Sequence, residues 1–149
     1  MQPPTQNNSQ QDLDLRVRTM RTLWLALMAS VGMYLLFTLI VGRPANLQSN
    51  STLSLALLGV TVLITLLSFF VRKWLVSKAV ARRQVPMVQQ AYIATWALAE
   101  IGGLLGMLDF FATSDRYYYV FFLIAVGAQL LHFPRREDVV NASYGPSGL

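Results

Sequence analysis

The sequence predicts an all-α integral membrane protein, a bundle of four transmembrane helices with both termini cytoplasmic. Three observations predict this fold. Only 13% of the 149 residues are charged and 54% are hydrophobic, whereas soluble domains carry about 25% charged residues. The charges gather in short segments with long uncharged runs between them. Apolar residues occur on every face of these runs, which distinguishes them from amphipathic surface helices.

The two tails lack the apolar residues that a folded core needs. Residues 1–15 are rich in Gln, Asn and Pro, and residues 139–149 end in Gly, Pro and Ser. Segments of this composition bury too little apolar surface to offset the entropy of folding. We therefore predict that both tails are disordered and that the membrane domain covers residues 16–138.

Four apolar runs are candidates for the spans. The first, residues 23–41, is too long for a signal-peptide core of about 7–15 residues and ends at Gly-Arg-Pro, a helix stop. The second, residues 53–71, follows the helix-capping sequence Ser-Asn-Ser-Thr. The third, residues 88–108, contains one charged residue, and the fourth, residues 117–133, is closed by Pro-Arg-Arg. Each reaches roughly 26–32 Å as a helix, enough for a hydrocarbon core of about 30 Å.

The basic residues set the orientation of the spans. Two of the twelve Lys and Arg residues, Arg43 and Arg116, lie in the loops after the first and third spans, and the other ten flank the remaining span ends. Because Lys and Arg accumulate on the cytoplasmic side, both termini are predicted to be cytoplasmic. This topology explains the basic composition without nucleic-acid binding. We expect the protein in the bacterial cytoplasmic membrane.

The segment 72–83 carries five of these basic residues. It either continues the second span as one helix that stops before Pro86 or bends onto the inner leaflet. Cations near a membrane surface attract anionic lipid by about 1 kcal/mol each. We expect anionic lipid as a partner of this segment, although a role in setting topology alone also explains the charges.

Soluble enzyme chemistry has few residues to use in this chain. The sequence contains no Cys and one His, His132, and it lacks phosphate-binding and nucleophile motifs. We expect no catalytic residue, no metal site and no cofactor, so the protein is not predicted to be an enzyme. We place His132 and Asp109 near the two membrane interfaces, with Asp109 solvated.

Glu100 is the one charged residue inside the third span. An ionised carboxylate at the centre of a bilayer costs at least about 2.5–3.5 kcal/mol. No Lys, Arg or His lies at mid-depth in any predicted span to compensate it. We therefore expect a carboxyl that takes up and releases a proton or binds a cation, or a neutral carboxyl that holds helices together by hydrogen bonds. The hydroxyls available to it are those of Ser30, Thr38, Thr61, Thr65, Ser68 and Thr95.

One flank of the third span is formed by small residues. Ala99, Gly102, Gly103 and Gly106 produce two overlapping small-xxx-small pairs, which allow close approach of another helix. On a helical wheel this flank adjoins Glu100. We therefore predict that the carboxyl lies at a helix–helix interface.

These residues resemble subunit c of F-type ATP synthases, a proteolipid with a helical hairpin. Arg82, Arg83, Gln84 and Pro86 are similar to its cytoplasmic Arg-Gln-Pro loop, with Val85 inserted. The sequence "ALAEIGGLLGM" at 97–107 is similar to its second helix, which carries the ion-binding carboxylate with a Gly six residues later. The resemblance implies that Glu100 is an H⁺ or Na⁺ carrier. The resemblance covers about 50 of the 149 residues. The chain also resembles a type of small four-span bacterial membrane protein that has a c-like third helix.

Two hypotheses of function remain, with a third ranked below them. The first is an ion-coupling subunit that uses Glu100 and assembles as a homo-oligomer or within a larger membrane complex. The second is a non-catalytic accessory or scaffold subunit. The third is a small-molecule carrier of the four-helix multidrug type, which places its membrane-embedded Glu in the first helix, whereas here it is in the third.

Overall fold

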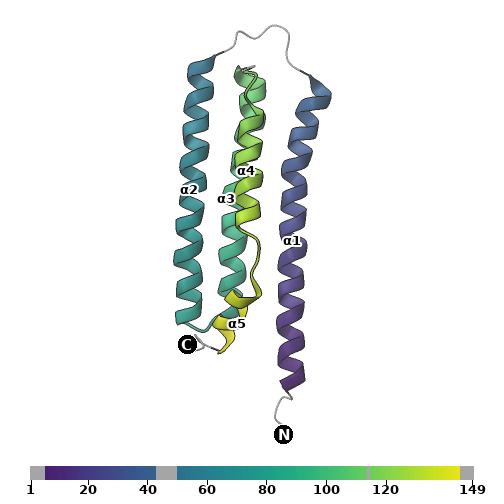
Figure 1. Cartoon of the computed structure of the whole chain (residues 1–149), viewed down its shortest axis with the longest axis vertical. Coiled ribbons are helices and arrows are strands. Elements are labelled where there is room, and N and C mark those ends of the chain that lie inside the picture. The colour runs from purple at the N-terminus through teal and green to yellow at the C-terminus, as the bar shows by residue number, and fades with distance from the viewer. Residues whose placement is uncertain (1–5, 43–49, 114, 145–149) are drawn as a thin grey trace.

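The computed structural model describes residues 6–42, 50–113 and 115–144. These residues form five α-helices, and no strand occurs among them. The four longer helices run in alternating directions, and the short α5 lies at the end of the bundle where α1 begins (Figure 1). We call this end the α5 end. The helices are α1 (Gln6–Val41), α2 (Ser51–Ala81), α3 (Val85–Thr113), α4 (Tyr119–Leu131) and α5 (Arg136–Tyr144).

Three of these helices, α1, α2 and α3, are long and apolar enough to cross a membrane. Their number and length indicate a membrane-embedded protein. Helix α4 is apolar but has only 13 residues, so it reaches about 20 Å, less than the hydrocarbon core of about 30 Å. It is shorter than the predicted span 117–133, because Tyr117 and Tyr118 form a turn and the chain leaves the helix at His132.

Helix α3 is the central element of the bundle. It packs against all four other helices, whereas α1 and α2 do not contact each other within the described residues. Figure 1 shows α3 and α4 between them. In the most apolar part of each helix, 44% of the residues of α3 are buried, against 17% in α1 and in α2. The small residues of α3 allow this crowding, because a helix without bulky side chains lets its neighbours approach closely.

The outer faces of α1 and α2 expose large apolar side chains. Ile40 on α1 is 74% exposed and Phe70 on α2 is 69% exposed. A continuous apolar surface of this kind favours association or aggregation in water. Hydrocarbon solvates it without penalty, which agrees with the length and composition of the helices.

The turn between α2 and α3 is short and well defined. Helix α2 continues without a bend to Ala81 and stops before Pro86, the first of the two arrangements expected for segment 72–83. The amide of Gln84 donates to the carbonyl of Ala79 and that of Arg83 to the carbonyl of Val80, which is the Schellman arrangement. Arg83 adopts a left-handed φ of 51°. Pro86 lies in the first turn of α3, where a missing amide hydrogen costs nothing.

Parts of both predicted tails are helical. Helix α1 begins at Gln6, and its residues Leu13 and Val17 are buried. Helix α5 covers residues 136–144, and its residues Val139 and Ala142 are buried in the same apolar cluster. The prediction of disorder is therefore wrong for residues 6–15 and 139–144. The physical reason is that apolar residues at helical spacing in both segments pack against each other and against α3; residues 1–5 and 145–149 lie outside the described part.

Candidate functional site

The carboxyl group of Glu100 joins α3 to α1. It lies at the sixteenth position of the 29-residue helix α3 and therefore close to its middle. Its Oε1 atom lies 2.6 Å from the hydroxyl oxygen of Ser30 and accepts a hydrogen bond of 2.9 Å from the hydroxyl of Tyr34. Ser30 and Tyr34 are four residues apart on α1, so both hydroxyls project from the same face of that helix.

The hydroxyl of Ser30 has two short contacts but only one hydrogen. Besides Oε1 of Glu100, its oxygen lies 2.8 Å from the carbonyl oxygen of Leu27. Together with the bond from Tyr34 there are three short oxygen–oxygen contacts, and the two hydroxyls supply two hydrogens. An ionised carboxylate supplies none. A protonated carboxyl supplies the third, since it can donate to Ser30 while Ser30 donates to Leu27.

Glu100 is only half-buried, and its second oxygen is not enclosed by the bundle. Among the described residues Oε2 has no hydrogen-bond partner. The neighbours on the same side of α3, Ala97 one turn before and Leu104 one turn after, are exposed and apolar. The carboxyl therefore lies on the surface seam between α1 and α3, surrounded by side chains that suit hydrocarbon.

The small residues of α3 lie at the contacts with three different helices. A Cβ on Gly103 would be 3.4 Å from Val31 of α1, and a Cβ on Gly102 would be 3.3 Å from Thr61 of α2 and 3.4 Å from Ala125 of α4. A Cβ on Gly106 would be 2.7 Å from the Cβ of Phe121 on α4. Ala99 is also buried. These four residues form the contact surface of α3, and Glu100 lies at its edge toward α1.

Of the hydroxyl residues predicted as partners of Glu100, the structure brings Ser30 to it. Thr38, Thr61 and Thr95 donate to carbonyls of their own helices, and Ser68 donates to the carbonyl of Thr65. Tyr34 was not predicted, because an aromatic residue in an apolar run is usually part of the packing. Its position four residues after Ser30 is the signal that could have identified it.

A second group of polar side chains lies toward the α5 end. The guanidinium of Arg72 donates to the hydroxyl of Tyr92 at 2.8 Å, and Tyr92 donates to a carboxylate oxygen of Asp138. Arg72 also forms an ion pair of 3.5 Å with Asp138. This group connects α2, α3 and α5 and holds α5 on the bundle. The loop residues Arg82, Arg83, Gln84 and Pro86, by contrast, are all exposed and lie outside this group.

Asp109 and His132 are both buried within the bundle, so the prediction that Asp109 is solvated is wrong. Asp109 is 0% exposed; its Oδ1 accepts from the hydroxyl of Thr113 at 2.9 Å, and its buried Oδ2 has no partner among the described residues. His132 is also 0% exposed, and its Nε2 lies 2.9 Å from the hydroxyl of Ser68. The prediction of a solvated Asp109 relied on its position along the span, whereas burial depends on which face of the helix the residue occupies.

Comparisons of the chain with protein-family models, curated proteins and solved structures find no match. A functional assignment therefore depends on the residues and the geometry of this chain.

Proposed function

We propose that this is an integral membrane protein in which Glu100 reversibly binds a proton, as the ion-binding residue of an ion-coupling subunit. The observation that carries the proposal is the position of the carboxyl: mid-helix, held by two hydroxyls of α1, with its second oxygen open to an apolar surface. Proton binding and release need a carboxyl that is anchored in one place but still accessible. A carboxyl enclosed on all sides would meet only the first condition.

The hydrogen count supports the neutral form as the resting state in the bilayer. All three short contacts around Ser30 and Glu100 have a hydrogen when the carboxyl is protonated. Loss of the proton removes one of them and leaves a charge beside hydrocarbon, which costs at least about 2.5–3.5 kcal/mol. Release therefore requires a partner that covers the open oxygen, either a cation or a polar group of another chain.

The rest of the proposal concerns the setting of this site. We place the α5 end, with its basic α2–α3 turn, in the cytoplasm of a bacterium, and α4 as the fourth and shortest crossing. The apolar seam around Glu100 is the surface on which a second copy or another membrane subunit meets the carboxyl. The proton is favoured over Na⁺ because the hydroxyl of Tyr34 donates to the carboxyl, whereas a bound cation needs the lone pair of that hydroxyl.

The proposal is tested by labelling with a hydrophobic carbodiimide, which reacts with protonated carboxyls in apolar surroundings. The protein in lipid vesicles is labelled at pH 5–9, and the modified residues are identified by mass spectrometry. We expect rapid labelling of Glu100 that persists above pH 7, and slow labelling of the exposed Glu137 on α5. Protection by Na⁺ would change the assigned ion from H⁺ to Na⁺.

Two variants serve as controls for this labelling. Glu100→Gln should abolish it, whereas Asp109→Asn, on the same helix, should leave it unchanged. If Glu100 is not labelled at any pH in folded protein, the proposed ion-binding role is refuted.

The second candidate function is that of a non-catalytic scaffold subunit, in which Glu100 only connects α1 to α3. The hydrogen bonds across this helix pair are the observation that favours it. Gln at this position keeps an acceptor oxygen and the size of the side chain. The scaffold hypothesis therefore predicts that Glu100→Gln changes neither folding nor proton movement across vesicles. The ion-coupling hypothesis predicts normal folding and loss of proton movement.

A further inference from the structure

A groove of about 660 Å³ runs between α2 and α5 at the α5 end. Its lining contains three cations, Arg72, Lys73 and Arg135, and one anion, Asp138. Arg72 and Asp138 form an ion pair with each other, so their charges compensate. Among the described residues, Lys73 and Arg135 form no ion pair, and both side chains are exposed. The groove therefore has a net charge of two positive units and is complementary to an anion.

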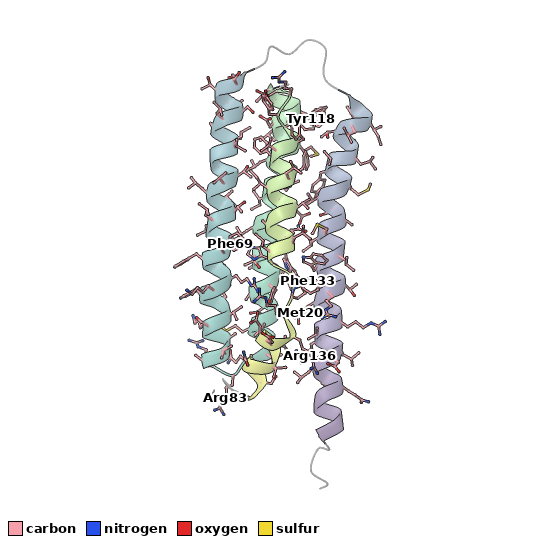
Figure 2. The ribbon with its side chains drawn as sticks, viewed as in Figure 1. Met20, Phe69, Arg83, Tyr118, Phe133 and Arg136 are labelled. Atoms are coloured by element: carbon pink, nitrogen blue, oxygen red, sulfur yellow. The ribbon has the colours of Figure 1, made fainter. Side chains whose placement is uncertain are left out.

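The groove also has a definite order of side chains along α2. Phe69, Lys73 and Ser77 occupy successive positions of one i, i+4 row that lines it, and neighbours in such a row are about 6 Å apart along the axis. Figure 2 shows Phe69 on the side of α2 that faces the centre of the bundle. An aromatic ring, an ammonium group and a hydroxyl thus follow each other toward the α5 end.

Lys73 is the second residue after the apolar run 53–71 and is therefore placed at the level of the lipid phosphates in a bilayer. Phe69 is then at the level of the upper acyl chain, and Ser77 and Asn141 of α5 are at the level of the polar headgroup. The order apolar, cationic and polar is that of a phospholipid read from chain to headgroup. A soluble anion would make no use of the apolar part.

We propose that this groove binds one anionic phospholipid, with the phosphate between Lys73 and Arg135 and one acyl chain against Phe69. The site does not depend on Glu100 and adds a specific position to the general attraction of basic segments for anionic lipid. A lipid attracted only by the overall basic charge would bind equally well near the exposed Arg82 and Arg83, which lie outside the groove.

The proposal is tested by native mass spectrometry of the full-length protein in an uncharged detergent. The protein is titrated with phosphatidylglycerol, and with phosphatidylcholine of the same acyl chains. We expect one tightly retained phosphatidylglycerol per protein. The double variant Lys73→Gln/Arg135→Gln should lower the apparent affinity for phosphatidylglycerol by about tenfold or more, because each interfacial cation contributes roughly fivefold. The control Arg82→Gln/Arg83→Gln removes two cations outside the groove and should lower this affinity by about twofold at most. Helicity in the same detergent verifies that both variants are folded.

Three results would overturn the proposal. Equal loss of binding in both double variants would show diffuse attraction in place of a site. Equal binding of phosphatidylglycerol and phosphatidylcholine would show that the groove does not select an anionic head, and a peptide or second copy would become the occupant to test. Displacement of the lipid by an equimolar amount of soluble glycerol phosphate would show that the groove binds free anions and that the acyl chain is irrelevant.

Discussion

Replacement of Gly106 by Ala tests the packing of α3 against α4 most directly. The added Cβ would lie 2.7 Å from the Cβ of Phe121 and 3.2 Å from the ring of Phe122. Carbon atoms in contact are normally about 3.5–4.0 Å apart, so the first contact is too short by about 1 Å. The Cβ of Phe121 is attached to the backbone and cannot rotate away, which means that one helix must shift as a whole.

The expected magnitude follows from two opposing effects. Overpacking of a well-packed interface costs typically 1–3 kcal/mol, and Ala is favoured over Gly in a helix by about 0.8–1.0 kcal/mol. We therefore expect Gly106→Ala to lower the free energy of unfolding by up to about 2 kcal/mol. At Gly59 on α2 no atom lies within 4 Å of an added Cβ, so Gly59→Ala should be neutral or stabilising.

Thermal unfolding in an uncharged detergent, followed by circular dichroism, measures this difference. Gly103→Ala is the intermediate case, because its Cβ would have ordinary contacts of 3.4–3.5 Å with Val31 and Tyr34. The expected order of stability is Gly59→Ala, Gly103→Ala and Gly106→Ala, from highest to lowest. Equal stability of Gly106→Ala and Gly59→Ala would refute the close packing of α3 on α4.

Three further predictions follow from single interactions. Tyr34→Phe removes one hydrogen bond to Glu100 and should cost about 1 kcal/mol in unfolding by dodecyl sulfate; no change would mean that the bond does not hold α1 on α3. Arg83→Gly should raise the melting temperature, by up to about 1 kcal/mol in stability, because a left-handed residue is strained unless it is Gly; a lower melting temperature would contradict this. Asp138→Asn weakens the contact with Tyr92 and should accelerate amide exchange in α5 by about tenfold, and unchanged exchange would show that apolar burial alone fixes α5.

The sequence predicts the three long helices well, because uninterrupted apolar runs leave a chain in a bilayer no alternative to helix. It does not predict the helical parts of the tails. Leu13 in one tail and Val139 and Ala142 in the other belong to one apolar cluster with residues of α2 and α3. Such structure depends on contacts between distant parts of the chain, which composition does not reveal.

Part of the candidate site was predictable. Glu100 and Ser30 are exceptional residues within apolar runs, and each attracts attention independently of the fold. The role of Tyr34 and the burial of Asp109 depend on the rotation of each helix about its axis, and α1 and α3 expose apolar residues as well as burying them. Their apolar pattern therefore leaves the inward face undefined.

The lack of contact between α1 and α2 affects how the chain assembles. Neighbouring spans often form a hairpin as soon as both have left the ribosome, but here the partners of α1 are α3, α4 and α5. The hydrogen bond from Trp24 to the carbonyl of Gln129 joins residues 105 positions apart. Contacts of such high sequence separation form late. We therefore expect the nascent chain to hold its first two helices in the bilayer as independent elements, and α1 to join the fold after most of the chain has been inserted.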